Sequence, residues 1–126
     1  MLYDEIKLTR REMTRAEIDS AINLLLAGDY VSAHVLAFAG KAILRGIAKS
    51  QGIETLEDEF ELYINDEHVK KWRESINDAY NVFKHANDDP ERELDKFRPE
   101  TTVVAIFTAL TNYGSIRHGG SCWSFQ

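Results

Sequence analysis

The apolar residues of this chain recur mainly at helical spacing, and they predict four or five helices. In the first of these, the apolar residues that share one face are Ile18, Ala21, Ile22 and Leu25. Thr14 followed by Glu17 has the spacing of a capping box, in which the hydroxyl and the carboxylate each accept from a free backbone amide. We therefore expect this helix to begin at Thr14 and to end at Gly28, a residue that tolerates the left-handed conformation.

A second helix follows after a very short link, so the two must fold back as an antiparallel hairpin. Asp29 can cap it, and Lys49 and Gly52 mark its end, which predicts a helix over residues 30–50. Its apolar residues occupy most of the circumference: Val31, Val35, Leu36, Phe38, Ala39, Ala42, Ile43 and Ile47. Such a helix is central to a bundle. His34 lies on it and is predicted to be a core histidine with satisfied hydrogen bonds.

Residues 53–66 are acidic and predict a short amphipathic helix, with Thr55 and Asp58 at capping spacing and the charged face in solvent. A long helix is predicted over residues 67–87. Its packing stripe steps by four and three: Trp72, Ile76, Ala79, Phe83 and Ala86. The opposite face is polar and ends in Asn81, Lys84 and His85.

A last helix is predicted over residues 99–113, with Pro99 in its first turn and Gly114 as its stop. The residues of its expected packing face are Val103, Ile106, Phe107, Leu110 and Tyr113. Residues 101–107 are rich in β-branched side chains, so a strand is the alternative, but the length and the end signals favour a helix. Residues 114–126 form an irregular tail whose Trp123 and Phe125 predict docking on this chain or a neighbour.

Taken together, these patterns predict an all-α, antiparallel helical bundle with an irregular C-terminal tail. The length of 126 residues fits a single domain over 1–126, with the bundle in residues 14–113 and the tail in 114–126. Cys122 is the sole cysteine, so no intrachain disulfide can form and a reducing compartment is expected. No apolar run approaches the ~20 residues of a membrane span, and the acidic start is unlike a signal peptide. We therefore expect a cytoplasmic protein without a membrane partner.

The net charge of −6 changes the range of expected partners. Residues 51–126 carry 8 basic and 15 acidic residues, whereas residues 1–50 carry 7 and 6. Proteins that bind nucleic acid tightly need a basic face, because contacts to phosphates supply most of their affinity. The composition therefore gives no support to tight nonspecific nucleic-acid binding.

His85, with Lys84 and Asn81, is the candidate catalytic or phosphate-binding site. In this interpretation His85 is a general acid or base, Lys84 supplies charge, and Asn81 orients the ring. The alternative is that His85 and Lys84 only place positive charge at the end of a helix, where it meets the helix dipole. The chain has no His-Glu-x-x-His motif, nucleophile elbow or phosphate-binding glycine loop, so neither a metal nor a cofactor is expected.

Two stretches resemble known families. Residues 28–30 (Gly-Asp-Tyr), with the alanine-rich helix after them, and residues 81–85 (Asn-Val-Phe-Lys-His) resemble the signatures of HEPN-like helical domains. The Phe-Lys-His-Ala run, followed by acids and Pro90, is also similar to a set of small bacterial proteins without an assigned function. The HEPN resemblance implies a bundle of four or five helices that is often a homodimer.

In active HEPN-like members, an arginine and a histidine separated by four to six intervening residues form a ribonuclease site at the dimer interface. By this resemblance His85 would be that histidine. Positions 78–80 hold Asp, Ala and Tyr, and Arg73 lies twelve residues before His85. The resemblance therefore implies a member without an intact catalytic motif.

These observations leave three hypotheses about function. The first is a bacterial, homodimeric, HEPN-like module with a binding or regulatory role. The second is a ribonuclease or phosphohydrolase that uses His85 as its acid or base and takes RNA or a nucleotide. The third is a scaffold that offers its helical hairpin and aromatic tail to a protein partner.

Overall fold

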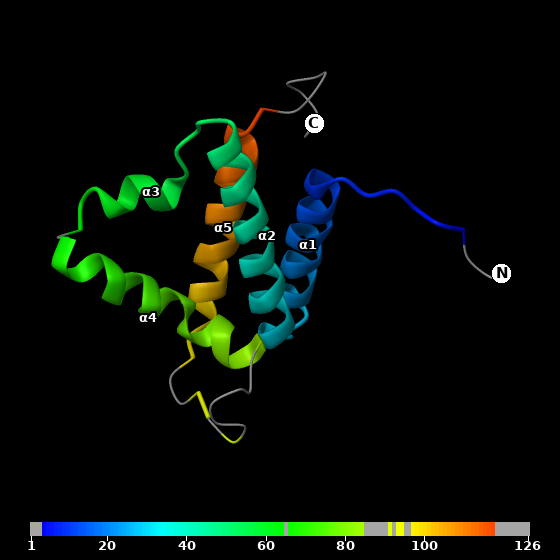
Figure 1. Cartoon of the computed structure of the whole chain (residues 1–126). Coiled ribbons are helices and arrows are strands. Elements are labelled where there is room, and N and C mark those ends of the chain that lie inside the picture. The colour runs from blue at the N-terminus through cyan, green and yellow to red at the C-terminus, as the bar shows by residue number, and fades with distance from the viewer. Residues whose placement is uncertain (1–3, 65, 85–90, 92, 95–96, 118–126) are drawn as a thin grey trace.

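The fold is an all-α bundle, as the sequence predicts. The computed structural model describes residues 4–64, 66–84, 91, 93–94 and 97–117, and for residues 75 and 84 only the backbone. Within these residues there are five helices and no strand: α1 (Arg10–Leu26), α2 (Tyr30–Ser50), α3 (Leu56–Glu61), α4 (Asp66–Lys84) and α5 (Pro99–Ser115). Helices α1, α2 and α5 lie side by side, and α3 and α4 extend to one side of them (Figure 1).

Helix α1 begins four residues before the predicted start. The capping box is formed by Thr9 and Glu12: the Thr9 hydroxyl accepts from the Glu12 amide at 3.1 Å, and the Glu12 carboxylate accepts from the Thr9 amide at 3.2 Å. Thr14 is fully buried inside the helix. Two Thr-x-x-Glu pairs occur in succession, and the earlier one forms the cap because Thr14 is needed on the packed face. Gly28, with φ +86°, follows the helix where a left-handed stop was predicted.

Helix α2 has its predicted bounds and its predicted central position. The Asp29 carboxylate caps it by accepting from the Ser32 amide at 3.1 Å. It packs against α1, α4 and α5. Gly40 allows α1 to come close, since a Cβ there would lie 3.3 Å from Ile18 Cγ1. By length and composition alone α2 could cross a membrane, contrary to the expectation that no segment approaches a span. In the bundle, 39% of its most apolar window is buried.

The core between α1, α2 and α5 consists of two clusters. The buried members of the first are Ile18, Leu44, Ala48, Ala109 and Ile116. The buried members of the second are Ala21, Ala37, Phe38, Ala105 and Ile106. Half of these ten side chains are alanine, so the helices approach each other closely around the larger buried residues.

The predicted packing face of α5 is wrong in part. Ile106 is buried, but Val103, Phe107 and Leu110 are 49%, 68% and 47% exposed. The buried residues are mostly small or polar: Thr102, Ala105, Ile106, Thr108, Ala109 and Asn112. Close contact with α2 selects for small side chains, and this places the large apolar residues of α5 on its outer side. The helix also continues through Gly114 to Ser115, so Gly114 does not end it.

The first residues of the predicted tail are docked on the bundle. Ile116 is buried in the first cluster. The Arg117 amide donates to Gln51 Oε1 at 2.7 Å, and Gln51 Nε2 donates to the Arg117 carbonyl at 2.9 Å. The Arg11 guanidinium donates to the same carbonyl at 2.9 Å. The predicted docking of Trp123 and Phe125 concerns residues outside the described part of the chain.

Candidate functional site

The structure describes only part of the site predicted at the end of α4. Asn81 is exposed on α4. Lys84 is the last residue of α4, and only its backbone is described. His85 lies outside the described residues, as do residues 86 and 87 at the predicted end of this helix. The proposed roles of His85, Lys84 and Asn81 therefore stay predictions.

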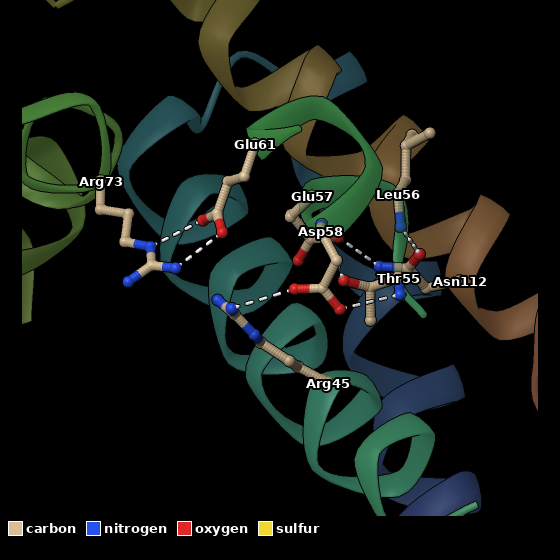
Figure 2. A network of polar contacts seen from close by, with 8 residues as sticks. All are labelled: Arg45, Thr55, Leu56, Glu57, Asp58, Glu61, Arg73 and Asn112. Carbon is tan, nitrogen blue, oxygen red and sulfur yellow. Dashed lines mark hydrogen bonds and ion pairs between the residues drawn. The ribbon is translucent and has the colours of Figure 1, made fainter. Parts of the chain in front are cut away.

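A polar network around α3 brings together side chains from four helices (Figure 2). Arg73 on α4 donates two hydrogen bonds of 2.6 Å to the two carboxylate oxygens of Glu61 on α3. Arg45 on α2 donates to Asp58 Oδ1 at 3.2 Å. Paired donors of this kind fix the orientation of a guanidinium as well as its position. The expectation that the acidic face of α3 is solvated is therefore wrong in part: Glu59 is exposed, but Asp58 and Glu61 connect α3 to α2 and α4.

The start of α3 is held by α5. The backbone amide of Leu56 donates to Asn112 Oδ1 at 2.9 Å, and Asn112 Nδ2 donates to Glu57 Oε1 at 2.6 Å. Thr55 and Asp58 form the predicted capping box. Asn112 is 2% exposed, so this amide is a buried anchor for a six-residue helix.

Charges and hydrogen bonds in this network favour the ionised carboxylates. Burial raises the pKa of Asp58, but hydrogen bonds from Thr55 and the charges of Arg45 and Arg73 lower it by more. The hydrogen bonds from Arg73 likewise lower the pKa of Glu61. Both side chains are therefore anionic at neutral pH, and each faces a guanidinium.

A pocket of about 180 Å³ opens beside this network, and we call it the polar pocket. Charged and amide residues on its lining are Lys41, Arg45, Glu57, Glu61, Arg73 and Asn77. The rings of Phe38, Trp72 and Tyr80 also line it, and the rings of Phe38 and Tyr80 are stacked with centroids 5.3 Å apart. Charged groups above aromatic walls are typical of sites that hold a small ligand in one orientation.

Lys41 differs from Arg45 and Arg73, the other two cations of the polar pocket, which are each bonded to a carboxylate. Its Nζ lies 4.5 Å from the centre of the Phe38 ring. Within the described residues, no acceptor or carboxylate is bonded to this ammonium group. Burial lowers the pKa of Lys41, the Glu57 charge raises it, and Arg45 lowers it again, so the net pKa lies below the ordinary value. A lysine with these properties in a pocket is a candidate binding residue.

His34 forms a second buried polar site, between α2, α4 and α5. Its Nδ1 lies 2.7 Å from Thr102 Oγ1, while its Nε2 has no hydrogen-bond partner among the described residues. Rings of Phe38, Phe83 and Phe97 surround it with centroids 4.5, 5.6 and 5.1 Å away. Burial, with the charge of Lys41, lowers the pKa of His34 to about 4. It is a core histidine, as predicted, and among the described residues only Nδ1 of its ring has a hydrogen-bond partner.

The polar pocket was not predicted from the sequence, although one signal for it was present. Lys41 and Arg45 are four residues apart on a helix that is otherwise apolar on most sides. Two cations at this spacing lie on the same face of a helix. The acidic partner of Arg45 and the rings of Trp72 and Tyr80 come from segments further along the chain, so periodicity alone could not bring them together.

No protein-family model matches this chain, and neither does any curated protein or solved structure with which it was compared. The site must therefore be interpreted from its own geometry. Over the described ranges, no three His, Cys, Asp or Glu side chains are placed to hold a metal ion. The arrangement around Lys41 offers charge, hydrogen-bond donors and ring surfaces, which serve binding.

Proposed function

We propose that this chain is a homodimeric, HEPN-like binding or regulatory module of bacterial type that acts without an intact catalytic motif. The observation that carries the binding role is the polar pocket, where the Lys41 ammonium is partly buried and not bonded to a carboxylate within the described chain. Such a group favours an anionic ligand, since the ligand restores the stabilisation that burial removed. The resemblance of residues 28–30 and 81–85 to HEPN-like domains supports the same class.

The outer face of α5 supports the dimer. Its residues recur at spacings of four, three and four: Val103, Phe107, Leu110 and Gly114. The first three are exposed apolar side chains, and residues 101–115 include no charged residue. A stripe of this spacing matches the seam of two packed helices, and its partner must be equally free of charge. Although 29% of the residues in this chain are charged, residues 101–115 are not, so a second copy of α5 supplies such a partner.

The change Phe107→Glu is expected to convert the dimer into a monomer. In an antiparallel pair of α5 helices, Phe107 lies near the middle of the stripe, and two glutamates there would bring uncompensated charges into an apolar contact. Light scattering after size-exclusion chromatography measures the mass of each variant. Leu62→Glu is the matched control, because Leu62 is 77% exposed outside this stripe, and it should leave the dimer unchanged. A wild-type protein that is monomeric at micromolar concentration contradicts the dimer and leaves the outer face to a different protein partner.

Incubation of the purified protein with single-stranded RNA is expected to yield no cleavage products. The physical reason is the absence of an arginine at positions 78–80, since without a guanidinium at this spacing the charge that develops on the phosphate during cleavage is stabilised poorly. Gel electrophoresis of end-labelled RNA checks this, with the His85→Ala variant in parallel. Cleavage that His85→Ala abolishes, at an unchanged melting temperature, would instead establish the ribonuclease hypothesis.

A further inference from the structure

A second pocket adjoins the polar pocket and extends it toward α5. It has a volume of about 210 Å³, and we call it the apolar pocket. Five residues line both: Phe38, Lys41, Glu57, Trp72 and Ile76. The remaining lining of the apolar pocket, which is mostly apolar, consists of Phe60 from α3 and Thr101, Val104, Ala105 and Thr108 from α5. One end of this joint space is therefore charged, the other is apolar, and Lys41 belongs to both.

The size of the apolar pocket suits one ring. A protein cavity of roughly 150 Å³ lined by apolar side chains holds benzene, so about 210 Å³ admits a six-membered ring with little room for a second. Phe60 and Trp72 offer ring surfaces against which an aromatic ring packs. A ligand that fills both pockets therefore has one ring and a polar group within a bond or two of it.

The charges of the polar pocket select the polar group. Three cations and two carboxylates line this pocket, and Arg73 and Glu61 already neutralise each other. Glu57 is held by its hydrogen bond from Asn112. Arg45 pairs with Asp58. The charge of Glu57 raises the pKa of Lys41, but no described carboxylate is bonded to the Lys41 ammonium, so this ammonium is open to one negatively charged group of a ligand. A doubly charged phosphate needs two positive partners to balance its charge, whereas a carboxylate needs only the single ammonium of Lys41.

We propose that the joined pockets bind a single-ring aromatic carboxylate, with the ring between Phe60, Trp72 and Val104 and the carboxylate on Nζ of Lys41. This inference rests on the proposed binding role and adds the chemical class of the ligand. Binding places an anion beside an ammonium that burial otherwise disfavours, so the ligand raises the pKa of Lys41. The affinity consequently falls as the pH rises toward the pKa of the bound lysine.

Isothermal titration calorimetry of the full chain with phenylacetate tests the proposal. Phenylacetate is expected to bind with a stoichiometry of one per chain. Lys41→Met should weaken it by about tenfold or more, because a charge-assisted hydrogen bond is lost while the apolar volume is kept. Lys49→Met is the matched control on the same helix, since Lys49 is exposed, and it should bind like the wild type. Phenylacetamide, which has the same shape without the charge, should bind the wild type as weakly as phenylacetate binds Lys41→Met.

A second variant tests the proposed contact between the pocket and the ring of the ligand. Phe60 is 49% exposed, so Phe60→Ala is expected to fold and to weaken phenylacetate by about threefold or more through lost ring contact. Absence of phenylacetate binding, equal affinity for phenylacetamide, or unchanged affinity in Lys41→Met would overturn the proposal. Tighter binding of phenyl phosphate than of phenylacetate would overturn the carboxylate assignment. The dimer and RNA measurements do not depend on any of these outcomes, so they show separately whether the proposed function stands.

Discussion

Replacing Asn112 with alanine is expected to lower the free energy of unfolding by about 3 kcal/mol. The amide of Asn112 is buried and makes two hydrogen bonds, one from the Leu56 backbone amide and one to the Glu57 carboxylate. Alanine leaves the Leu56 amide without its acceptor and leaves a small void between α3 and α5. Urea unfolding at pH 7 measures the change, and hydrogen exchange should be faster at the start of α3.

Two further variants test whether the loss of stability comes from the hydrogen bonds of Asn112. Asn77→Ala is the control, because Asn77 is exposed and donates to the Arg73 carbonyl of its own helix, so its loss should cost less than about 0.5 kcal/mol. Asn112→Asp keeps an acceptor for Leu56 but turns a carboxylate oxygen toward Glu57, and it should be as destabilising as alanine. If Asn112→Ala leaves both the unfolding midpoint and the exchange of α3 unchanged, the amide does not anchor this helix.

Acid is expected to destabilise the protein between pH 6.5 and pH 4 through His34. Burial lowers the pKa of His34 to about 4, whereas the unfolded chain has the ordinary value of 6.5. In this window the unfolded state binds a proton that the folded state does not, so stability rises with pH and is lost on acidification. The slope is about 1.4 kcal/mol per pH unit, and the total loss is about 3 kcal/mol.

The variant His34→Phe separates this effect from other titrations. It suits a site already surrounded by three phenylalanine rings, and its free energy of unfolding should change little between pH 7 and pH 5. Burial raises the pKa of Glu17, so above pH 4.5 this group makes acidification favour the folded state, the opposite of His34. Asp58 and Glu61 have lowered pKa values, so their contribution to stability is lost only below the ordinary carboxyl range. Equal acid sensitivity of the wild type and of His34→Phe would exclude His34 as the cause.

Much of the helical framework follows from local sequence. Asp29 and the Thr55–Asp58 pair cap their helices as predicted, and Gly28 and Gly52 have positive φ where a stop was expected. These signals act over three or four residues, so they do not depend on the fold. The start of α1 was misplaced, because Thr9 and Thr14 offer the same signal and only the packing against α2 distinguishes them.

The packing of α5 and the polar pocket could not be predicted in the same way. Hydrophobicity favours Phe107 and Leu110 for the core, yet the available space beside α2 admits Ala105 and Ala109. The pocket depends on Lys41 meeting Glu57, Glu61 and Arg73, which lie 16 to 32 residues further along the chain. Their meeting depends on the angle at which α4 leaves the bundle, and no local pattern encodes that angle.

The pairing of Gln51 with Arg117 has a topological consequence. The side-chain amide of Gln51 makes two hydrogen bonds to the backbone of Arg117, as a neighbouring β-strand would. Arg11, in the first turn of α1, donates a third hydrogen bond to the Arg117 carbonyl. The beginning of α1 and the end of α5 are thereby held at one pole of the bundle, 106 residues apart in sequence. A circularly permuted form in which a short peptide links residue 117 to residue 9, and in which the chain is opened at a different loop, is accordingly expected to keep the helix contacts of the original.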